Sequence, residues 1–470
     1  MPEPQPHPHP LRILILGTSI AGPALASYLL LSPTLSSSLS ITLLERSPTP
    51  RTTGQNIDLR GVGIECVQRL GLLPTIRQHL TGEAGVHWVD ERDFPVASIP
   101  ASKAGEAQGP TAELEILRGR LAGCLVRRCE ELGKERGGSG VEFMYGDHVE
   151  KIEQEGEEVR VKLANSKREM VFDLVVGADG LQSKTRRQVF GLSGETSRVH
   201  RLHIYGAFFS MPRTEADDDW RRWFHAPGRR GVMIRPSDRP DRVTVFMHKK
   251  TSSEEEAAPF EEAARSAYGE TKAQKRLMKE TFKGMVWREE RILRELEESE
   301  DFYYSPVAQV KMEKWIHGRV VLLGDAAHSP SPLSGMGTTL ALSGAYNLAG
   351  ALSTHPDDIP AALALYEETQ RPLVEAGQRL SPAISLLYDS DSAWRVWAVN
   401  WFAAGVSYFG PVMKAVFNVV GGEANRKGMG LREFGLRRGE EVDLRFELEV
   451  LIGEENGHRR RERKRRNSEL

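Results

Sequence analysis

The segment LRILILGTSIAGPALASYLL, from Leu11 to Leu30, constrains the fold more than any other part of this 470-residue chain. Five of its first six residues are aliphatic, which is typical of a parallel strand buried on both faces. Gly17 and Gly22 bound a turn of small residues, and an Ala- and Leu-rich stretch follows as a helix. Gly17 permits the tight turn, and Gly22 lets the helix pack closely, so the helix N-terminus can meet a pyrophosphate. The segment therefore predicts a nucleotide site in an α/β protein.

Ser19 stands where the dinucleotide-binding pattern GxGxxG has its middle glycine. A serine is small enough to let the backbone approach phosphates, and its hydroxyl can donate a hydrogen bond. The next predicted strand, LSITLLERS, ends in Glu45, 23 positions after Gly22. A carboxylate at about this distance accepts hydrogen bonds from a ribose 2′-hydroxyl. The alternative is a glycine-bearing strand–helix turn in another doubly wound enzyme.

The composition is that of a globular protein, with 40% hydrophobic and 27% charged residues. A formal net charge of −2 gives no electrostatic reason to expect nucleic-acid binding. The three cysteines, Cys66, Cys124 and Cys129, form no CxxC pair and are typical of reduced thiols inside a cell. We therefore expect a cytoplasmic protein without a metal site.

Three segments near the ends of the chain differ in composition from the rest of it. Residues 1–10 are Pro- and His-rich and predict a disordered leader, and residues 426–470 predict a polar, partly disordered tail. The apolar stretch 396–420 is long enough to span a bilayer, but Asn400 and Lys414 interrupt it at a high cost in lipid. We favour C-terminal helices whose aromatic residues cover the domain junction and line the substrate entrance, with membrane association as the alternative.

Two further motifs share the pattern of the first, a buried strand followed by a turn of small residues. DLVVGADGLQSKTR covers residues 173–186, and GRVVLLGDAAHSPSPLSGMGTTLALSGAYNLAGAL covers residues 318–352. Each predicts a buried strand that ends in a small-residue turn with an aspartate, at the sheet edge where open α/β proteins bind ligands. In the second motif, Gly335 and Gly337 precede a helix rich in small residues. That helix N-terminus can receive phosphates or the edge of a flat ring.

Together the three motifs resemble those of group A flavoprotein monooxygenases, the class of para-hydroxybenzoate hydroxylase and the tetracycline-inactivating monooxygenases. GADGxxSxxR is complete in residues 177–186, and GDAAH…P…GMG is nearly complete in residues 324–337. The resemblance spans about residues 10–380. It implies an α/β fold in which a Rossmann-like FAD-binding domain is interleaved with an antiparallel-sheet substrate domain and followed by C-terminal helices.

The resemblance also implies domain boundaries. The FAD-binding domain is expected in residues 11–80, 111–190 and 306–380, the substrate domain in 81–110 and 191–305, and the C-terminal helices in 381–425.

Residue by residue, the resemblance implies a cofactor site. The backbone of the turn that contains Gly17, Ser19 and Gly22 binds the pyrophosphate of FAD. The other implied cofactor contacts are Glu45 to the adenosine ribose with Arg46 beside it, Arg118 to the phosphates and ribityl region, Asp325 to the ribityl chain, and the backbone of Gly335 and Gly337 to the isoalloxazine.

Other positions match the family less directly. Asp58 matches an aspartate near the flavin of the tetracycline-inactivating enzymes, and Arg51 falls at the spacing of their NADPH-contacting arginine. Asp179 belongs to a signature associated with both FAD and NADPH, whereas Arg120 stands where many relatives have aspartate. We assign no catalytic residue and interpret the candidates as structural: His225, Arg235, His248 and His328.

The implied activity is that of a monooxygenase of secondary metabolism that uses FAD and NADPH or NADH. A flavin C4a-hydroperoxide delivers one oxygen atom from O₂ to a small aromatic or polycyclic metabolite, because the cofactor performs the chemistry and the protein positions it. Two alternatives stay open: a flavin-dependent oxidase or dehydrogenase on the same fold, and a non-flavin Rossmann protein such as a methyltransferase.

Overall fold

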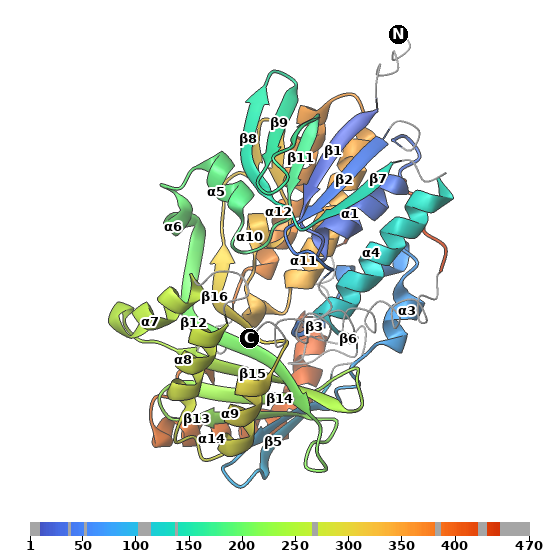
Figure 1. Ribbon diagram of the computed structural model, residues 1–470. Coiled ribbons are helices and arrows are strands. Elements are labelled where there is room, and N and C mark those ends of the chain that lie inside the picture. The colour runs from blue at the N-terminus through green and yellow to red at the C-terminus, as the bar shows by residue number, and fades with distance from the viewer. Residues whose placement is uncertain are drawn as a thin grey trace.

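The computed structural model describes residues 10–35, 39–50, 54–101, 114–136, 140–265, 271–380, 387–421 and 430–441. Two halves lie one above the other in Figure 1, a parallel-sheet half at the top and an antiparallel-sheet half below it. The predicted leader up to His9, the tail beyond residue 441 and Arg51 lie outside the described residues.

The parallel-sheet half is built on a six-stranded sheet in the order β17-β18-β11-β1-β2-β7. Its central strand β1 pairs in parallel with β2 and β11, and Ile13, Leu14 and Ile15 of β1 are at most 1% exposed. This burial on both faces confirms the strand that the aliphatic run predicts. The strands are β1 (Leu11–Leu16), β2 (Leu39–Glu45), β7 (Val141–Tyr145), β11 (Leu174–Gly177), β17 (Ile316–His317) and β18 (Val320–Leu322).

Helices and a small sheet cover this central sheet. Helix α11 is buried along nearly its whole length because its small residues let α1, α2 and α12 pack closely against it. The helices of this half are α1 (Ala21–Leu30), α2 (Val62–Arg69), α3 (Leu73–Gln78), α4 (Arg118–Glu135), α5 (Lys184–Phe190), α6 (Glu195–Arg198), α10 (Asp325–His328), the 3₁₀ turn η1 (Pro332–Ser334), α11 (Gly337–Thr354) and α12 (Ile359–Gly377). The small sheet consists of β8 (Val149–Glu155), β9 (Glu158–Leu163) and β10 (Glu169–Phe172).

The antiparallel-sheet half is a seven-stranded sheet in the order β16-β12-β15-β14-β13-β4-β5. Helices α7, α8 and α9 cover one face and bury a core that includes Phe209, Phe224 and Phe282. Because β4 precedes the crossover helix α4 and pairs in parallel with β13, the two halves are interleaved in sequence. The elements are β4 (Gly85–Val89), β5 (Pro95–Pro100), β12 (Val199–Pro212), β13 (Arg221–Ala226), β14 (Arg230–Pro236), β15 (Arg242–Lys250), β16 (Tyr303–Val310), α7 (Glu254–Ala264), α8 (Lys272–Phe282) and α9 (Glu289–Glu298).

The stretch 430–441 packs onto the parallel-sheet half. The ring of Phe434 lies over Gly350, where an added Cβ would come within 2.2 Å of it, and Leu436 is buried. The carboxylate of Glu433 forms an ion pair with Arg69. The predicted polar tail therefore contains a docked stretch, which its charged sequence does not indicate.

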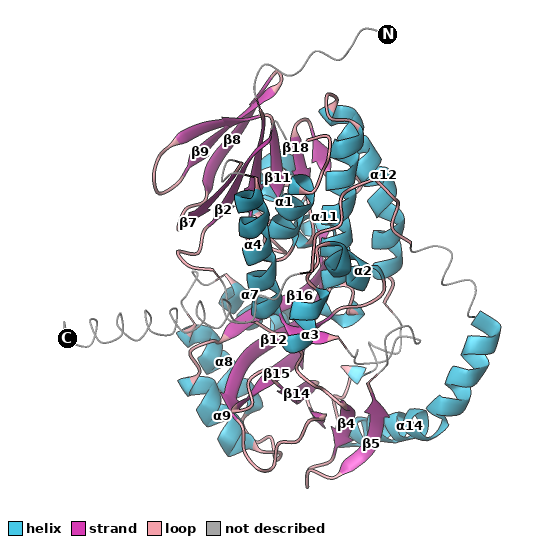
Figure 2. Ribbon diagram, turned by 90° about the vertical axis from the view of Figure 1, so that its right-hand side faces the viewer, coloured by secondary structure: helices cyan, strands magenta, loops and turns pink. Residues whose placement is uncertain are grey.

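Helix α14 (Ala393–Gly421) leaves the body of the molecule beyond β5, as Figure 2 shows. It contacts β5, where the Ser407 hydroxyl donates to the Ser98 carbonyl at 2.6 Å. The expectation that its aromatic residues cover the domain junction is wrong, because Trp397, Trp401 and Phe402 are each more than half exposed to solvent. Among the helices of the described ranges, none combines the length and the apolar character that crossing a bilayer requires.

Candidate active site

A cavity of about 650 Å³ lies between the two halves. One wall consists of the loops that follow β1, β11 and β18, together with the segment before α11 and the strand β3 (Asn56–Asp58), which pairs with β6 (Glu115–Leu117) behind it. The opposite wall consists of strands β12 to β16 of the antiparallel sheet. The cavity therefore lies at the carboxyl edge of the parallel strands, where the three sequence motifs predict a ligand.

Two glycines of the first motif are required by contacts between backbones. Gly17 has a φ of +110°, and an added Cβ would lie 2.5 Å from the carbonyl oxygen of Ala178. At Gly22 an added Cβ would lie 2.1 Å from the carbonyl oxygen of Gly17. No L-residue with a side chain fits such distances without a shift of the backbone. The loop after β1 thus sits directly against the loop after β11.

Ser19 lines the cavity beside Arg118. The Nη2 group of Arg118 donates to the Ser19 hydroxyl oxygen at 3.2 Å. A glycine at this position would remove that acceptor, so the serine gives the arginine a fixed neighbour. The serine that replaces the middle glycine of GxGxxG therefore accepts a hydrogen bond from Arg118 in this chain.

Glu45 ends β2 and bonds to the neighbouring loops. Its Oε2 atom accepts from the Thr18 N–H at 3.1 Å, and its Oε1 atom accepts from the Ser47 N–H at 3.0 Å. The Arg46 side chain is exposed next to it. Neither Glu45 nor Arg46 is among the described residues that line the cavity.

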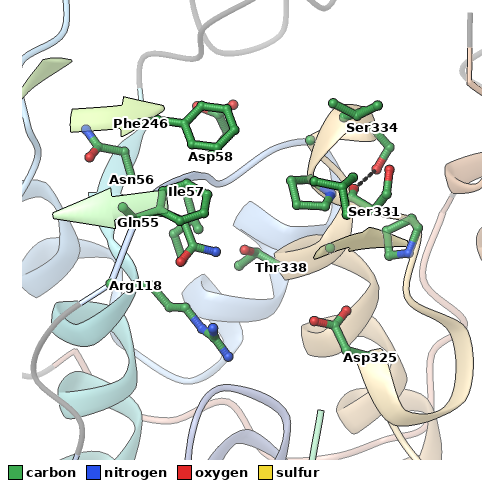
Figure 3. A pocket seen from close by; sticks show the side chains of 18 of the residues that line it. Gln55, Asn56, Ile57, Asp58, Arg118, Phe246, Asp325, Ser331, Ser334 and Thr338 are labelled. Carbon is green, nitrogen blue, oxygen red and sulfur yellow. Dashed lines mark hydrogen bonds between the residues drawn. The ribbon is translucent and has the colours of Figure 1, made fainter. Parts of the chain in front are cut away.

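Arg118 and Asp325 reach the cavity from opposite sides, as Figure 3 shows. They begin α4 and α10, respectively. Burial raises the pKa of Asp325, and the charge of Arg118 opposes that shift. An added Cβ at Gly335 or Gly337 would meet no protein atom closer than 3.8 Å. The space at the N-terminus of α11 is therefore open to a ligand.

The second motif supports the cavity from behind. Ala178 and Gly180 line it, whereas the Asp179 carboxylate accepts from the Ser183 hydroxyl at 2.5 Å and from the Thr185 N–H at 3.0 Å. Asp179 thus fixes the start of α5. The buried Arg186 donates from Nη1 to the Ala326 carbonyl at 2.8 Å, which ties the second motif to the third.

Asp58 lies on the same wall, on β3. Its Oδ2 atom pairs with Nη2 of Arg60 at 2.8 Å and faces Gly335. Arg120 is not among the described residues that line the cavity, and it pairs with the buried side chain of Asp238.

Aromatic side chains form part of the wall from the antiparallel sheet. The rings of Phe208 and Phe246 stack with centroids 4.4 Å apart. The aromatic side chains that line this side are those of Phe208, Trp223, Phe246, Tyr303 and Tyr388.

The histidines considered from the sequence lie outside the described lining of the cavity. His225 and His248 are buried behind Tyr388, and burial lowers the pKa of His225 to about 4 and that of His248 well below its usual range. His328 packs against Trp315, and burial lowers its pKa to about 3. All three are therefore neutral at pH 7.

Two arginines and two glutamates form a buried cluster that the sequence does not reveal as a unit. Arg221 and Arg235 line the cavity, and Glu83 and Glu115 lie behind them. Of the four, only Arg235 is a candidate on the sequence alone. The four positions come from a loop, β6, β13 and β14, so no local spacing connects them. We call these four residues the charged cluster.

Comparison with known proteins agrees with this geometry. The family model described as FAD binding domain matches residues 11–380. The FAD-dependent monooxygenase asL6 of Sarocladium schorii is 34% identical over 379 residues, covering 78% of this chain and 86% of the relative. Tetracycline destructase Tet(51) superposes with a TM-score of 0.69 at 26% identity, covering 91% of this chain and 100% of that chain. HpxO of Klebsiella pneumoniae, complexed with FAD and uric acid, shares the fold with a TM-score of 0.61 at 17% identity, covering 87% and 96%.

The fold and the motif-lined cavity define a flavoprotein oxidoreductase. The chain belongs to the FAD-binding domain family, and it is a flavin-dependent monooxygenase. FAD also fits the residues present, because the open space beside Gly335 and Gly337 suits a flat ring and Arg118 can meet phosphate charge. A methyltransferase or another non-flavin Rossmann protein is excluded.

Proposed function

We propose that this enzyme uses FAD and NADPH, or NADH, to insert one oxygen atom from O₂ into a small aromatic or polycyclic metabolite. One observation carries the proposal: a single cavity joins the three motif loops to an aromatic wall. The aromatic side chains of this cavity suit a flat organic substrate, and the polar groups around them can orient it. The name of the structural neighbour, a tetracycline destructase, supports a polycyclic compound.

Several residues would hold the cofactor. The turn of Gly17, Ser19 and Gly22 would meet the pyrophosphate at the start of α1, where N–H groups and the helix dipole favour an anion. The remaining proposed contacts are Arg118 to phosphate and ribityl oxygens, Glu45 with Arg46 to the adenosine end, Asp325 to the ribityl chain, Asp58 near the ring, Asp179 through its loop, and the backbone of Gly335 and Gly337 along the ring. Arg51, the proposed NADPH contact, lies outside the described residues.

The chemistry supplied by bound FAD is acceptance of hydride from the nicotinamide and activation of O₂. The protein's own contribution is exclusion of water and orientation of the substrate. The stacked pair of Phe208 and Phe246, with Trp223 and Tyr388, presents a dry surface beside the open space at α11.

The test is oxygen incorporation by the purified, FAD-loaded enzyme. A panel of planar phenols and polycyclic enols is supplied with NADPH and isotopically labelled O₂, and NADPH consumption is compared with product mass. We expect at least one compound to accelerate NADPH oxidation and to gain a single labelled oxygen atom. NADPH consumption that yields only hydrogen peroxide with every compound would contradict the proposal and favour a flavin-dependent oxidase.

A further inference from the structure

The charged cluster is held together by direct contacts between its arginines and glutamates. Glu83 Oε1 lies 2.6 Å from Arg221 Nη2, and Glu83 Oε2 lies 2.9 Å from Arg235 Nε. Glu115 Oε2 pairs with Nη2 of Arg235 and lies 3.5 Å from Nη2 of Arg221. Both arginines are therefore fixed from behind while they line the cavity.

The position of Arg235 suits it to bind a ligand. Its contacts to the glutamates use Nε and Nη2, so Nη1 stays available to an acceptor in the cavity. A guanidinium held by a buried carboxylate keeps its orientation and its charge, which favours recognition of an oxygen anion. Trp223 lies two residues after Arg221 on β13 and also lines the cavity, so an aromatic surface adjoins the arginines.

The charge balance of the cluster limits what can bind. With both glutamates ionised, two positive and two negative charges cancel. An anion that bound to the arginines would leave one uncompensated negative charge in a buried place, which is costly. Uptake of one proton by a glutamate removes that cost.

Glu115 is the glutamate suited to take the proton. Burial raises its pKa to about 7, with Arg235 opposing this shift, Glu83 and Asp58 adding to it, and Arg221 opposing it weakly. Its Oε1 atom accepts from Thr81 Oγ1 and from Asn56 Nδ2, each at 2.7 Å. The Thr81 hydroxyl can reverse its role and accept from a protonated Oε1. Oε2 then remains an acceptor for the arginines.

We propose that Arg221 and Arg235 bind the oxygen anion of an acidic phenol or enol on a planar apolar substrate, and that Glu115 holds the proton which that hydroxyl loses. The O–H bond breaks heterolytically: its electron pair stays on the substrate oxygen, and the proton goes to Glu115 Oε1. The proposal rests on the monooxygenase function proposed above, because it assigns the substrate class of the same cavity. Ionisation of the phenol or enol raises electron density on the carbon to be oxygenated.

The test uses oxidised, FAD-loaded protein without NADPH, so that binding is measured apart from oxygenation. The probe is alizarin, a planar three-ring compound whose colour changes when its acidic hydroxyl ionises. Its dimethyl ether, which lacks the hydroxyl, is the matched control ligand. We expect bound alizarin to be the anion even at pH values where the free dye is neutral, and to bind about tenfold or more tightly than the ether.

Two variants separate recognition from proton storage. Arg235→Met should weaken alizarin binding about tenfold or more and leave ether binding unchanged. At pH 8 the acidic hydroxyl of free alizarin is already ionised, so the proton that Glu115 gains must come from the buffer. Titration calorimetry in buffers of different ionisation enthalpy should then show uptake of about one proton on alizarin binding, because anion binding raises the pKa of Glu115 further. Glu115→Gln should abolish this uptake, whereas Asp238→Asn, the same change in the neighbouring buried pair with Arg120, should retain it.

Each alternative outcome overturns the proposal. Alizarin bound in its neutral form, equal affinity for the ether, or unchanged proton uptake in Glu115→Gln would do so. Absence of alizarin binding to the wild-type protein would reject the substrate class, while the oxygen-incorporation test would still judge the monooxygenase function separately. If Arg235→Met loses FAD or unfolds, Arg235→Lys replaces it, since lysine keeps the charge without the forked geometry.

Discussion

The wall of the cavity that comes from the parallel-sheet half is made largely of backbone and small residues. The opposite wall is made of large side chains and buried charges from antiparallel strands. In the turn that carries the first wall, Gly17 and Gly22 are required because backbone atoms lie closer than 3 Å to an added Cβ. In the second, Arg235 is fixed by side chains from other segments of the chain. A wall formed by closely packed backbone tolerates few substitutions. In a wall formed by side chains, single substitutions can change which ligand binds.

The difference between the two walls can be tested most directly by a substitution at Gly22. Gly22→Ala places a Cβ 2.1 Å from the Gly17 carbonyl oxygen, so the loop after β1 must shift. We expect a loss of about 1–3 kcal/mol or more in the free energy of unfolding, together with loss of bound FAD. Thermal unfolding and the flavin absorbance of the purified protein measure both. Gly405→Ala is the control, because an added Cβ there meets nothing within 4 Å. A normal melting temperature and full flavin in Gly22→Ala would show that the two loops do not meet as described.

A second test asks whether the parallel-sheet half depends on the docked stretch 430–441. Ending the chain after residue 429 removes Phe434 from Gly350 and removes the buried Leu436. We expect a loss of about 2–4 kcal/mol in the free energy of unfolding. Amide exchange should become faster in α2 and α11 but not in β12 to β15. A chain that ends after residue 441 is the matched control and should resemble the full protein. Equal stability of the two shortened proteins would mean that the docked stretch contributes nothing.

The third prediction concerns cofactor affinity without a change of fold. Asp325→Ala removes a carboxylate that faces the cavity from the start of α10. Loss of a charge-assisted hydrogen bond to FAD should weaken binding by about 1.5–3 kcal/mol. Titration of the apoprotein with FAD, followed by fluorescence quenching, gives the dissociation constant. If Asp325→Ala retains FAD as tightly as the wild-type protein does, the third motif does not hold the cofactor.

The smallest expected effect lies in the antiparallel-sheet half, far from the motifs. Asp217 pairs with Arg288 and Arg291, each at 2.6 Å. Burial alone would raise its pKa, but hydrogen bonds from Arg291 and Thr214 lower it to about 2. Because the folded-state pKa is the lower one, the stabilisation is present above about pH 4 and is lost as the pH falls towards 2.

Asp217→Asn should therefore cost about 1–2 kcal/mol in the free energy of unfolding at pH 7. The difference from the wild-type protein should shrink between pH 4 and pH 2, as measured by urea unfolding across that range. FAD content should stay normal, because Asp217, Arg288 and Arg291 are not among the described residues that line the cavity. A difference that is constant with pH would show that the carboxylate is not ionised in the folded protein.

Much of the fold and of the motif-lined wall could be predicted from sequence, because their signals are local. A buried strand, a glycine turn and a helix start are neighbours in the chain, so Gly17 and Gly22 reveal the turn between β1 and α1. The charged cluster could not be predicted from the sequence. Glu83 and Glu115 come close to Arg221 and Arg235 only when β4 pairs with β13, which is distant in the chain.

Two segments differ from the sequence-based prediction for physical reasons. The apolar sequence of α14 predicts a helix. It does not predict which face of that helix is exposed, because the exposure of Trp397 and Trp401 depends on how α14 packs on β5. The sequence does not indicate the docked stretch, because its binding depends on the space over Gly350, in a helix about 80 residues earlier.

The order of strands in the parallel sheet also determines when the protein can fold during its synthesis. The strand β1 needs β11 beside it, and β11 needs β18, which ends at Leu322. At typical rates of translation, about 15–60 seconds separate the emergence of β1 from that of β18. For about the first half of that interval β1 lacks its neighbour β11, and for the rest of it β11 lacks its neighbour β18. Apolar strands therefore stay incompletely paired while the chain is being made, a condition in which chaperones bind nascent chains. Cofactor loading is consequently a late event, possible only after most of the chain has left the ribosome.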